Sequence, residues 1–165
     1  MNTYWNRFLD VTKPFLYKEN AMRVITYGTF DTLHFGHFEL LRRASEMGSQ
    51  LFVGVSTDEF NKTKGKDSCF PYLVRKNWIE SLRFVDCVIP ETSWVQKELD
   101  IKRLNIDVFV MGDDWEGHFD HLPCHVVYVP RTPNISSTLM KSAIANNCDQ
   151  FARALLPNQQ KIAQS

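Results

Sequence analysis

The 165-residue sequence has no excess of charge of either sign and no long apolar run. Lys plus Arg and Asp plus Glu number 19 each, so no overall field would attract nucleic acid or an anionic membrane. No apolar stretch approaches the length of a transmembrane helix, and residues 1–22 lack the apolar core of a signal peptide. We therefore expect neither a nucleic-acid-binding protein nor a membrane protein.

Cysteine is also scarce, and no CxxC pair occurs. The four cysteines are scattered, at Cys69, Cys87, Cys124 and Cys148. This usage is typical of reduced thiols and favours a cytoplasmic protein. With 44% hydrophobic residues, the chain can form one domain with a substantial core. We expect that domain at 23–147, after an N-terminal extension (1–22) and before a C-terminal helix and tail (148–165).

Segments typical of strands and of helices alternate along the chain. Runs of β-branched and aromatic residues predict five strands, at 24–27, 51–56, 85–90, 107–111 and 125–129. Apolar residues at helical spacing predict helices that begin near residue 37 and span 71–84, 94–104 and 139–145. This alternation predicts a doubly wound, Rossmann-like α/β fold, in which a parallel five-stranded sheet has helices on both faces.

The stretch 24–41 combines a strand, a glycine break and the start of a helix. His34 and His37 stand at the turn into that helix, and their spacing directs both imidazoles the same way. A helix N-terminus offers unpaired N–H groups to an anion, and Gly36 leaves room for a ligand to approach. The pair therefore predicts a phosphate or nucleotide site. Metal ligation is the competing use, but only Asp31 accompanies the pair as a third ligand.

Two basic segments follow other predicted strands. Three alternating lysines occupy a loop at 61–67, which is either a solvated charged loop or a lid that brings ammonium groups onto a polyphosphate. In the segment 131–138, Arg131 stands beside several hydroxyl side chains at a helix start. Helix capping would explain a serine there but not the arginine. Because ligands of parallel sheets bind outside the carboxyl ends of the strands, we expect these segments to gather near the His pair.

A stretch rich in potential metal ligands, GHFDHLPCH at 117–125, offers a different use for histidine. The side chains that could hold Zn²⁺ are His118, His121, Cys124 and His125. Their spacing matches no standard zinc module, and Pro123 with the following strand restricts the geometry. We therefore predict no metal-ligating residues, and zinc binding by this stretch stays an open alternative.

Taken together, these segments resemble the cytidylyltransferase branch of the HIGH-type nucleotidyltransferase superfamily. The matching segments are GTFDTLHFGH (28–37), STDEFN (56–61), RKNWIESLRFVDCVIP (75–90), DVFVMGDDWEGHFD (107–120) and RTPNISST (131–138). They span nearly all of the domain. HxGH alone would indicate only the superfamily, whereas its combination with MGDDW and an RTxxIS segment is much more specific.

The resemblance implies an enzyme that transfers CMP from CTP to a phosphorylated alcohol and releases pyrophosphate. Glycerol 3-phosphate is the expected acceptor. Ethanolamine phosphate or choline phosphate, an adenylyl transfer, and a non-catalytic nucleotide-binding protein are the alternatives. The acceptor phosphate is already ionised, so catalysis would depend on positioning and charge stabilisation rather than on a general base. Mg²⁺ is the expected cofactor, held largely by waters and nucleotide oxygens. A homodimer is also implied, with Arg83 near its interface.

The resemblance also assigns residues to the site. Those expected to be catalytic are His34, His37, Lys64 and Arg131. The two histidines would hold the triphosphate and stabilise the transition state. The other expected substrate-binding residues are Thr29, Phe30, Asp31, Lys66, Arg75, Gly112, Asp114, Thr132, Ile135 and Ser136. Among them, Arg75 would lie on the acceptor-phosphate side, and Asp114 would help to recognise the cytosine.

The chain departs from the family pattern at two places. Where the family typically has Arg-Thr-Glu-Gly-Ile-Ser, this sequence carries Pro133 and Asn134 in the middle. Asn tolerates a positive φ better than most residues, so we expect the turn to survive. Pro133 removes one N–H donor that a phosphate could use. Residues 1–22 have no counterpart in the compact form of the family.

Overall fold

A computed structural model of the chain describes residues 22–145. Five parallel strands form one sheet in the order β3-β2-β1-β4-β5. They are β1 (Arg23–Gly28), β2 (Gln50–Ser56), β3 (Cys87–Glu91), β4 (Val108–Gly112) and β5 (His125–Val129). All five predicted strands are confirmed, with ends shifted by at most two residues. The expected C-terminal helix and tail, and all of the N-terminal extension except Met22, lie outside the described residues.

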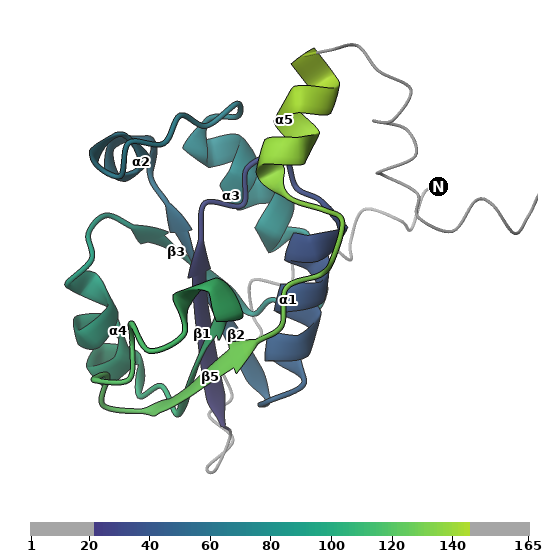
Figure 1. Cartoon of the computed structure of the whole chain (residues 1–165). Coiled ribbons are helices and arrows are strands. Elements are labelled where there is room, and N and C mark those ends of the chain that lie inside the picture. Colours follow the sequence, from purple (N-terminus) through teal and green to yellow (C-terminus); the bar gives the residue numbers. More distant parts are fainter. Residues whose placement is uncertain (1–21, 146–165) are drawn as a thin grey trace, which may run out of the picture.

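Helices cover both faces of this sheet, so the predicted doubly wound fold is confirmed. Figure 1 shows α1 (Phe35–Ser45) and α3 (Tyr72–Glu80) on one side and α4 (Gln96–Leu104) on the other. The last helix, α5 (Ser137–Ala145), begins beyond β5. The predicted helix at 71–84 extends four residues too far at its C-terminal end, because α3 ends at Glu80 and the chain then turns toward β3.

The predicted loop at 61–67 is partly wrong. A short helix, α2 (Asp58–Thr63), takes up its first half. The side-chain oxygen of Thr57 caps this helix by accepting the N–H of Phe60 at 3.2 Å. The prediction relied on the lysines and did not use this helix-start residue. Only the end of the predicted loop, from Lys64 onward, is irregular.

The core consists of two layers, because alternate residues of a strand point to opposite faces. Val24 and Val53 face α1, where Leu41 packs on them. Ile25 belongs to the other layer, and Phe109 packs beside it. Full burial of such side chains contributes about 1.5–3 kcal/mol each, which fixes the strand register and hence the positions of the loops that follow.

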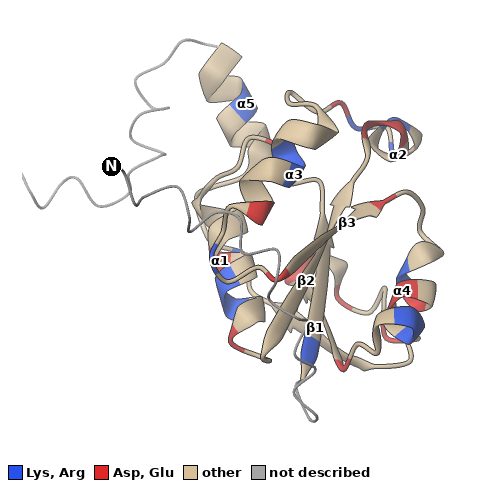
Figure 2. Cartoon of the chain, turned by 180° about the vertical axis from the view of Figure 1, so that it is seen from behind, with Lys and Arg blue, Asp and Glu red and all other residues tan. Residues whose placement is uncertain are grey.

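Charge on the outer helix faces is mixed. Figure 2 shows acidic and basic residues together on α1 and α4, and these include the ion pairs Arg42–Glu39 and Lys102–Glu98. Among residues 22–145, no helix combines the length and apolar character needed to cross a membrane.

The structural feature that bears on function is the carboxyl edge of the sheet, where the segments after all five strands meet.

Candidate functional site

A cavity of about 300 Å³ opens at the carboxyl edge of the sheet. Its walls come from the turn after β1, the start of α1, the short helix η2 (Asp113–Trp115) after β4, and the segment that leads into α5. All residues expected at the site except Asp31 and Arg75 line it, namely Thr29, Phe30, His34, His37, Lys64, Lys66, Gly112, Asp114, Arg131, Thr132, Ile135 and Ser136. The predicted gathering of distant segments is thereby confirmed.

His34 and His37 lie face to face in this cavity. Their ring centroids are 3.7 Å apart and the ring planes differ by 15°. His34 is the N-cap of α1, because its Nδ1 accepts the backbone N–H of His37 at 3.3 Å. The neutral ring of His34 therefore carries its proton on Nε2, which lies 3.4 Å from the hydroxyl of Ser137. The cap thus leaves the Nε2–H of His34 as a donor near the start of α5.

Both imidazoles are neutral at pH 7. Burial lowers the pKa of His34 to about 4, assisted by the positive charge of Arg131. Burial lowers the pKa of His37 to about 3, assisted by His34. The Nδ1 atom of His37 is buried and has no hydrogen-bond partner among the described residues. An anion bound beside the two rings would favour their protonated forms and raise both pKa values.

A buried ionic cluster occupies another wall of the cavity. The carboxylate of Glu91 contacts the ammonium group of Lys97 and lies 3.6 Å from that of Lys64. Ser56 joins the cluster through its hydroxyl. Glu91 and Lys97 were missed by the sequence interpretation. Glu91 directly follows a predicted strand, so the rule that located the other site segments could have found it, whereas Lys97 looks like an ordinary residue of an amphipathic helix.

Tryptophan side chains form an aromatic wall that the sequence did not reveal. The rings of Trp94 and Trp115 have centroids 5.7 Å apart, and both residues line the cavity. Trp94 also contacts Phe60 of α2, at 5.5 Å between centroids. Trp94 remains 47% exposed, so the part of its indole that Lys97 does not cover is accessible to a planar ring.

The segment before α5 brings charge and free N–H groups to the cavity. Arg131 lies 3.7 Å from Asp114 across the mouth, where both side chains are about half exposed. Ser136 caps α5 by accepting the N–H of Leu139 at 3.2 Å. Asn134 has a φ of 62°, which confirms that the altered turn persists with Asn in the left-handed conformation. The N-termini of α1 and α5 therefore border the same cavity.

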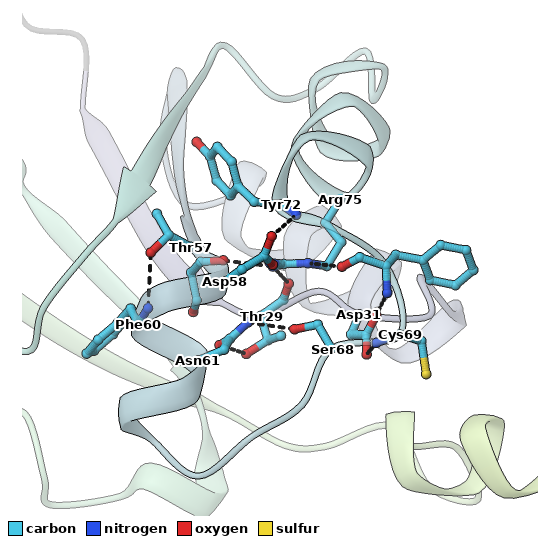
Figure 3. A network of polar contacts seen from close by, with 12 residues as sticks. Thr29, Asp31, Thr57, Asp58, Phe60, Asn61, Ser68, Cys69, Tyr72 and Arg75 are labelled. Carbon is cyan, nitrogen blue, oxygen red and sulfur yellow. Dashed lines mark hydrogen bonds and ion pairs between the residues drawn. The ribbon is translucent and has the colours of Figure 1, made fainter.

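Arg75 is not part of the cavity lining and is fully buried. Figure 3 shows its side chain among the polar contacts that it makes. Its guanidinium donates to the carbonyl oxygens of Phe70 at 2.8 Å, Thr29 at 2.7 Å and Ser56 at 2.8 Å. It also pairs with the Asp58 carboxylate at 2.7 Å. These contacts tie together the segments after β1 and β2 and the start of α3. The substrate contact expected from the resemblance stays a prediction.

Asp31 likewise lies outside the cavity lining and holds neighbouring segments. Its carboxylate accepts the N–H groups of Cys69 at 2.7 Å and Phe70 at 3.1 Å (Figure 3). Lys141 of α5 pairs with it at 2.8 Å. Burial by itself would raise the pKa of Asp31, but these hydrogen bonds outweigh burial and lower the pKa below its usual value. Asp31 is thus a buried anion next to the cavity.

The possible zinc ligands do not converge. His118, His121 and His125 are exposed, and Nδ1 of His118 lies 3.2 Å from the carbonyl oxygen of Trp115. Within the part of the chain that the structure describes, no group of three or more His, Cys, Asp or Glu side chains is arranged to hold a metal ion. The zinc alternative therefore has no support in the geometry.

Comparison with known proteins gives one consistent result. Residues 25–143 match the family model described as cytidylyltransferase-like. The glycerol-3-phosphate cytidylyltransferase of Staphylococcus aureus (strain NCTC 8325 / PS 47) is 57% identical over 124 residues, which cover 74% of this chain and 94% of that relative. The glycerol-3-phosphate cytidylyltransferase of Bacillus subtilis (strain 168) is 58% identical over 125 residues, which cover 74% and 97%.

A solved structure agrees at the level of the fold. The lipopolysaccharide core biosynthesis protein from Thermoplasma volcanium GSS1 superposes with a TM-score of 0.60. The match covers 68% of this chain and 98% of that chain, at 24% sequence identity. This likeness concerns the Rossmann-like fold alone.

Proposed function

Because the chain belongs to the cytidylyltransferase-like family, we propose that it transfers CMP from CTP to glycerol 3-phosphate, giving CDP-glycerol and pyrophosphate. The observation that carries this function is the convergence of the α1 and α5 N-termini with His34 and Arg131 on one cavity. Two helix N-termini with basic partners suit a polyphosphate. The relatives at 57% and 58% identity support both the nucleotide and the acceptor.

The reaction is an in-line displacement at the α-phosphorus of CTP. An oxygen of the acceptor phosphate forms the new bond to phosphorus, and the bond from that phosphorus to the oxygen bridging to the β-phosphate breaks. Pyrophosphate leaves with the electron pair of the broken bond. The acceptor phosphate is ionised at pH 7, so no general base is needed. Positioning and stabilisation of charge supply the catalysis.

We assign the charge-stabilising roles to the basic groups of the cavity. His34 and His37 donate N–H groups to the phosphoryl oxygens as negative charge develops on them. Lys64 and Arg131 neutralise the phosphates from different segments of the cavity lining. The cytosine side of the site includes Asp114. The remaining proposed substrate-binding residues that line the cavity are Thr29, Phe30, Lys66, Gly112, Thr132, Ile135 and Ser136. Asp31 and Arg75 support the site from outside the cavity.

Mg²⁺ is the proposed cofactor. The two carboxylates that line the cavity, Glu91 and Asp114, are both engaged by basic side chains. This donor set fits an ion whose ligands are mainly phosphate oxygens and waters. The ion would supply neutralisation of phosphate charge. The protein groups would supply orientation.

We also propose that the enzyme is a cytoplasmic homodimer. Phe35 and Phe38 of α1 are exposed aromatic side chains, which a second copy of the chain could cover. Arg83 is exposed, as a residue near such an interface must be in a single chain. The described cysteines, Cys69, Cys87 and Cys124, are free thiols, in keeping with a reducing compartment. Sedimentation velocity of the purified chain tests the dimer directly.

The first experiment is pyrophosphate release in the presence of Mg²⁺. CTP and ATP are each tested against glycerol 3-phosphate, phosphoethanolamine and phosphocholine. Release only with CTP and glycerol 3-phosphate is expected. Release with another acceptor would keep the mechanism and change the substrate. No release with any pair, although CTP binds, would point to an untested acceptor or to a non-catalytic protein.

A substitution at the histidine pair separates catalysis from binding. His34→Ala should lower kcat by at least about 100-fold, because it removes a donor to the developing charge. His121→Ala, at an exposed histidine outside the cavity, is the matched control and should leave kcat unchanged. If His34→Ala weakened CTP binding without affecting turnover, the proposed catalytic role would be wrong.

A further inference from the structure

Glu91 is a carboxylate in the wall of a cavity that we assign to anionic substrates. It lies at the end of β3 and only 3% of it is exposed. A buried carboxylate costs desolvation energy, and it repels a phosphate that approaches it. Neighbouring groups must therefore offset both its desolvation energy and its repulsion of phosphates.

Those neighbours are two ammonium groups and one hydroxyl. Oε2 of Glu91 accepts the Ser56 hydroxyl at 2.5 Å and lies 3.6 Å from Nζ of Lys64. Oε1 pairs with Nζ of Lys97. Nζ of Lys64 donates to the Ser56 hydroxyl at 2.8 Å. Ser56 thus links the carboxylate to Lys64, while Lys97 contacts the carboxylate directly.

The two lysines differ in their separation from Glu91, although both ammonium groups lie over aromatic rings. Nζ of Lys97 lies 4.7 Å from the ring centroid of Trp94, and Nζ of Lys64 lies 4.4 Å from that of Phe60. Lys64 comes from the C-cap of α2, and its ammonium group has a longer separation from the carboxylate. Lys97 therefore neutralises most of the charge of Glu91, and the charge of Lys64 stays available to a ligand.

We propose that Glu91 is a positioning residue for the CMP transfer: together with Ser56 it keeps Lys64 charged and directed at the cavity, while Lys97 prevents the carboxylate from repelling the substrate phosphates. The proposal rests on the function proposed above. It assigns Glu91 no contact with substrate, and its effect on the reaction passes through the ammonium group of Lys64.

The electrostatic surroundings of Lys64 support this role. Burial lowers the pKa of Lys64, and the charge of Glu91 from β3 opposes that effect. The other charged groups that face Lys64 are Lys66, from the loop after α2, and Lys97, from α4, and both lower the pKa further. Loss of the Glu91 charge would leave three cations near one another with no buried anion between them.

A measurement that needs no turnover tests the electrostatic part. The pKa of Lys64 is followed in the ligand-free enzyme by NMR of lysines labelled at Cε, with Lys64→Arg identifying the resonance. Glu91→Gln, which keeps the size and the hydrogen-bond acceptor, should lower the Lys64 pKa by about 1 unit. Glu98→Gln removes an exposed carboxylate of α4 and should leave it unchanged. An unaltered Lys64 pKa in Glu91→Gln overturns the proposal.

Kinetics test the positioning part. In Glu91→Gln we expect kcat to fall about 10- to 100-fold, as for a misplaced catalytic group, and the alkaline limb of kcat/KM to move about 1 unit lower in pH. Glu91→Asp should return the alkaline limb of kcat/KM to its wild-type pH. Ser56→Ala should lower kcat by a smaller factor than Glu91→Gln does. If Glu91→Gln does not fold, these two variants carry the test.

Three results distinguish the possible failures. If Glu91→Gln lost activity by the same factor at every pH, with the alkaline limb of kcat/KM unmoved, Glu91 would have only a structural role and the proposal would be overturned. Wild-type activity in Glu91→Gln would do the same. If the wild-type enzyme releases no pyrophosphate but Glu91→Gln still lowers the pKa of Lys64, the proposed function fails while the control of Lys64 by Glu91 stands.

Discussion

The ammonium group of Lys141 in α5 lies 2.8 Å from the buried carboxylate of Asp31, which follows β1. The same ammonium group donates to the carbonyl oxygen of Asp67 at 2.6 Å. Asp31 in turn accepts the N–H groups of Cys69 and Phe70. Three segments that are far apart in the sequence therefore meet at one charged centre beside the cavity. This centre ties α5 to the turn that precedes the histidine pair.

Removal of the Lys141 ammonium should destabilise the enzyme at neutral pH. Lys141→Met takes one charged hydrogen bond from a buried carboxylate, and we expect the free energy of unfolding at pH 7 to fall by about 1–2 kcal/mol. Urea denaturation measures this change. Lys102→Met, in a pair with Glu98 that is more than half exposed, is the control and should cost about 0.5 kcal/mol or less.

The pH dependence of that loss identifies its origin. The pKa of Asp31 is lower in the folded state than in the unfolded chain. Its contribution to stability is therefore complete above the unfolded pKa of about 3.9 and is lost as the pH falls through the folded value. The difference between wild type and Lys141→Met should shrink as the pH is lowered toward about 3. A constant difference would contradict the ionic assignment.

Arg75 should be needed chiefly for stability. Lysine cannot reproduce four hydrogen bonds from one planar group, so Arg75→Lys leaves buried carbonyl oxygens unpaired (Figure 3). We expect the free energy of unfolding to fall by about 3 kcal/mol or more, as measured by urea denaturation. Lys76→Met, at an exposed ion pair on the same helix, should change it by about 0.5 kcal/mol. Unchanged stability with a raised KM for glycerol 3-phosphate would instead support a direct substrate contact.

The histidine pair should make the ligand-free enzyme less stable in mild acid. The pKa values of His34 and His37 are about 4 and about 3, below the unfolded value of about 6.5. Between these values the unfolded chain binds more protons, so stability rises with pH up to about 6.5 and then levels off. Each histidine contributes a slope of up to about 1.4 kcal/mol per pH unit.

His34→Gln should remove one of these contributions. Denaturant melts between about pH 4.5 and pH 6.5 should show a shallower slope in the variant, since one proton fewer is taken up on unfolding. His121→Gln is the control at an exposed position. A slope that stays the same in His34→Gln would mean that His34 is not buried in its neutral form.

Gly36→Ala should affect activity more than stability. The added Cβ would lie 3.1 Å from the ring of His34 and 3.2 Å from Cγ2 of Ile135. Alanine also improves helix propensity by about 0.5–1 kcal/mol at this position in α1, which offsets the crowding. We expect a melting temperature near that of wild type and a kcat/KM about tenfold lower, because the ring is displaced.

The control for Gly36→Ala is a substitution on the same helix. Ser45→Ala alters the last residue of α1, away from the cavity lining, and should leave kcat/KM unchanged. If Gly36→Ala lowered the melting temperature and left kcat/KM intact, the close fit of Gly36 against His34 would have no importance for the reaction.

Local sequence patterns were enough to predict the strands and the segments that form the cavity. Val24 and Ile25 belong to a continuous run of β-branched and aromatic residues, which is typical of a buried strand, and His34 stands directly before a helix. Such signals depend on residues within one or two turns of each other. The same patterns failed at residues 58–63, where a capped helix of six residues carries too few apolar positions to show a period.

The sequence by itself determined the order of the elements, the parallel sheet, and the edge where the predicted site residues meet, because periodicity and helix-start chemistry are local and the carboxyl ends of parallel strands share one edge. Only the tertiary structure decided that Glu91 pairs with Lys97, that Trp94 faces Trp115, and that Asp31 and Arg75 hold loops behind the cavity. Those arrangements depend on how side chains from distant elements pack and on which buried charges find partners. A charged residue looks the same in the sequence whether its partner is a substrate or a backbone carbonyl.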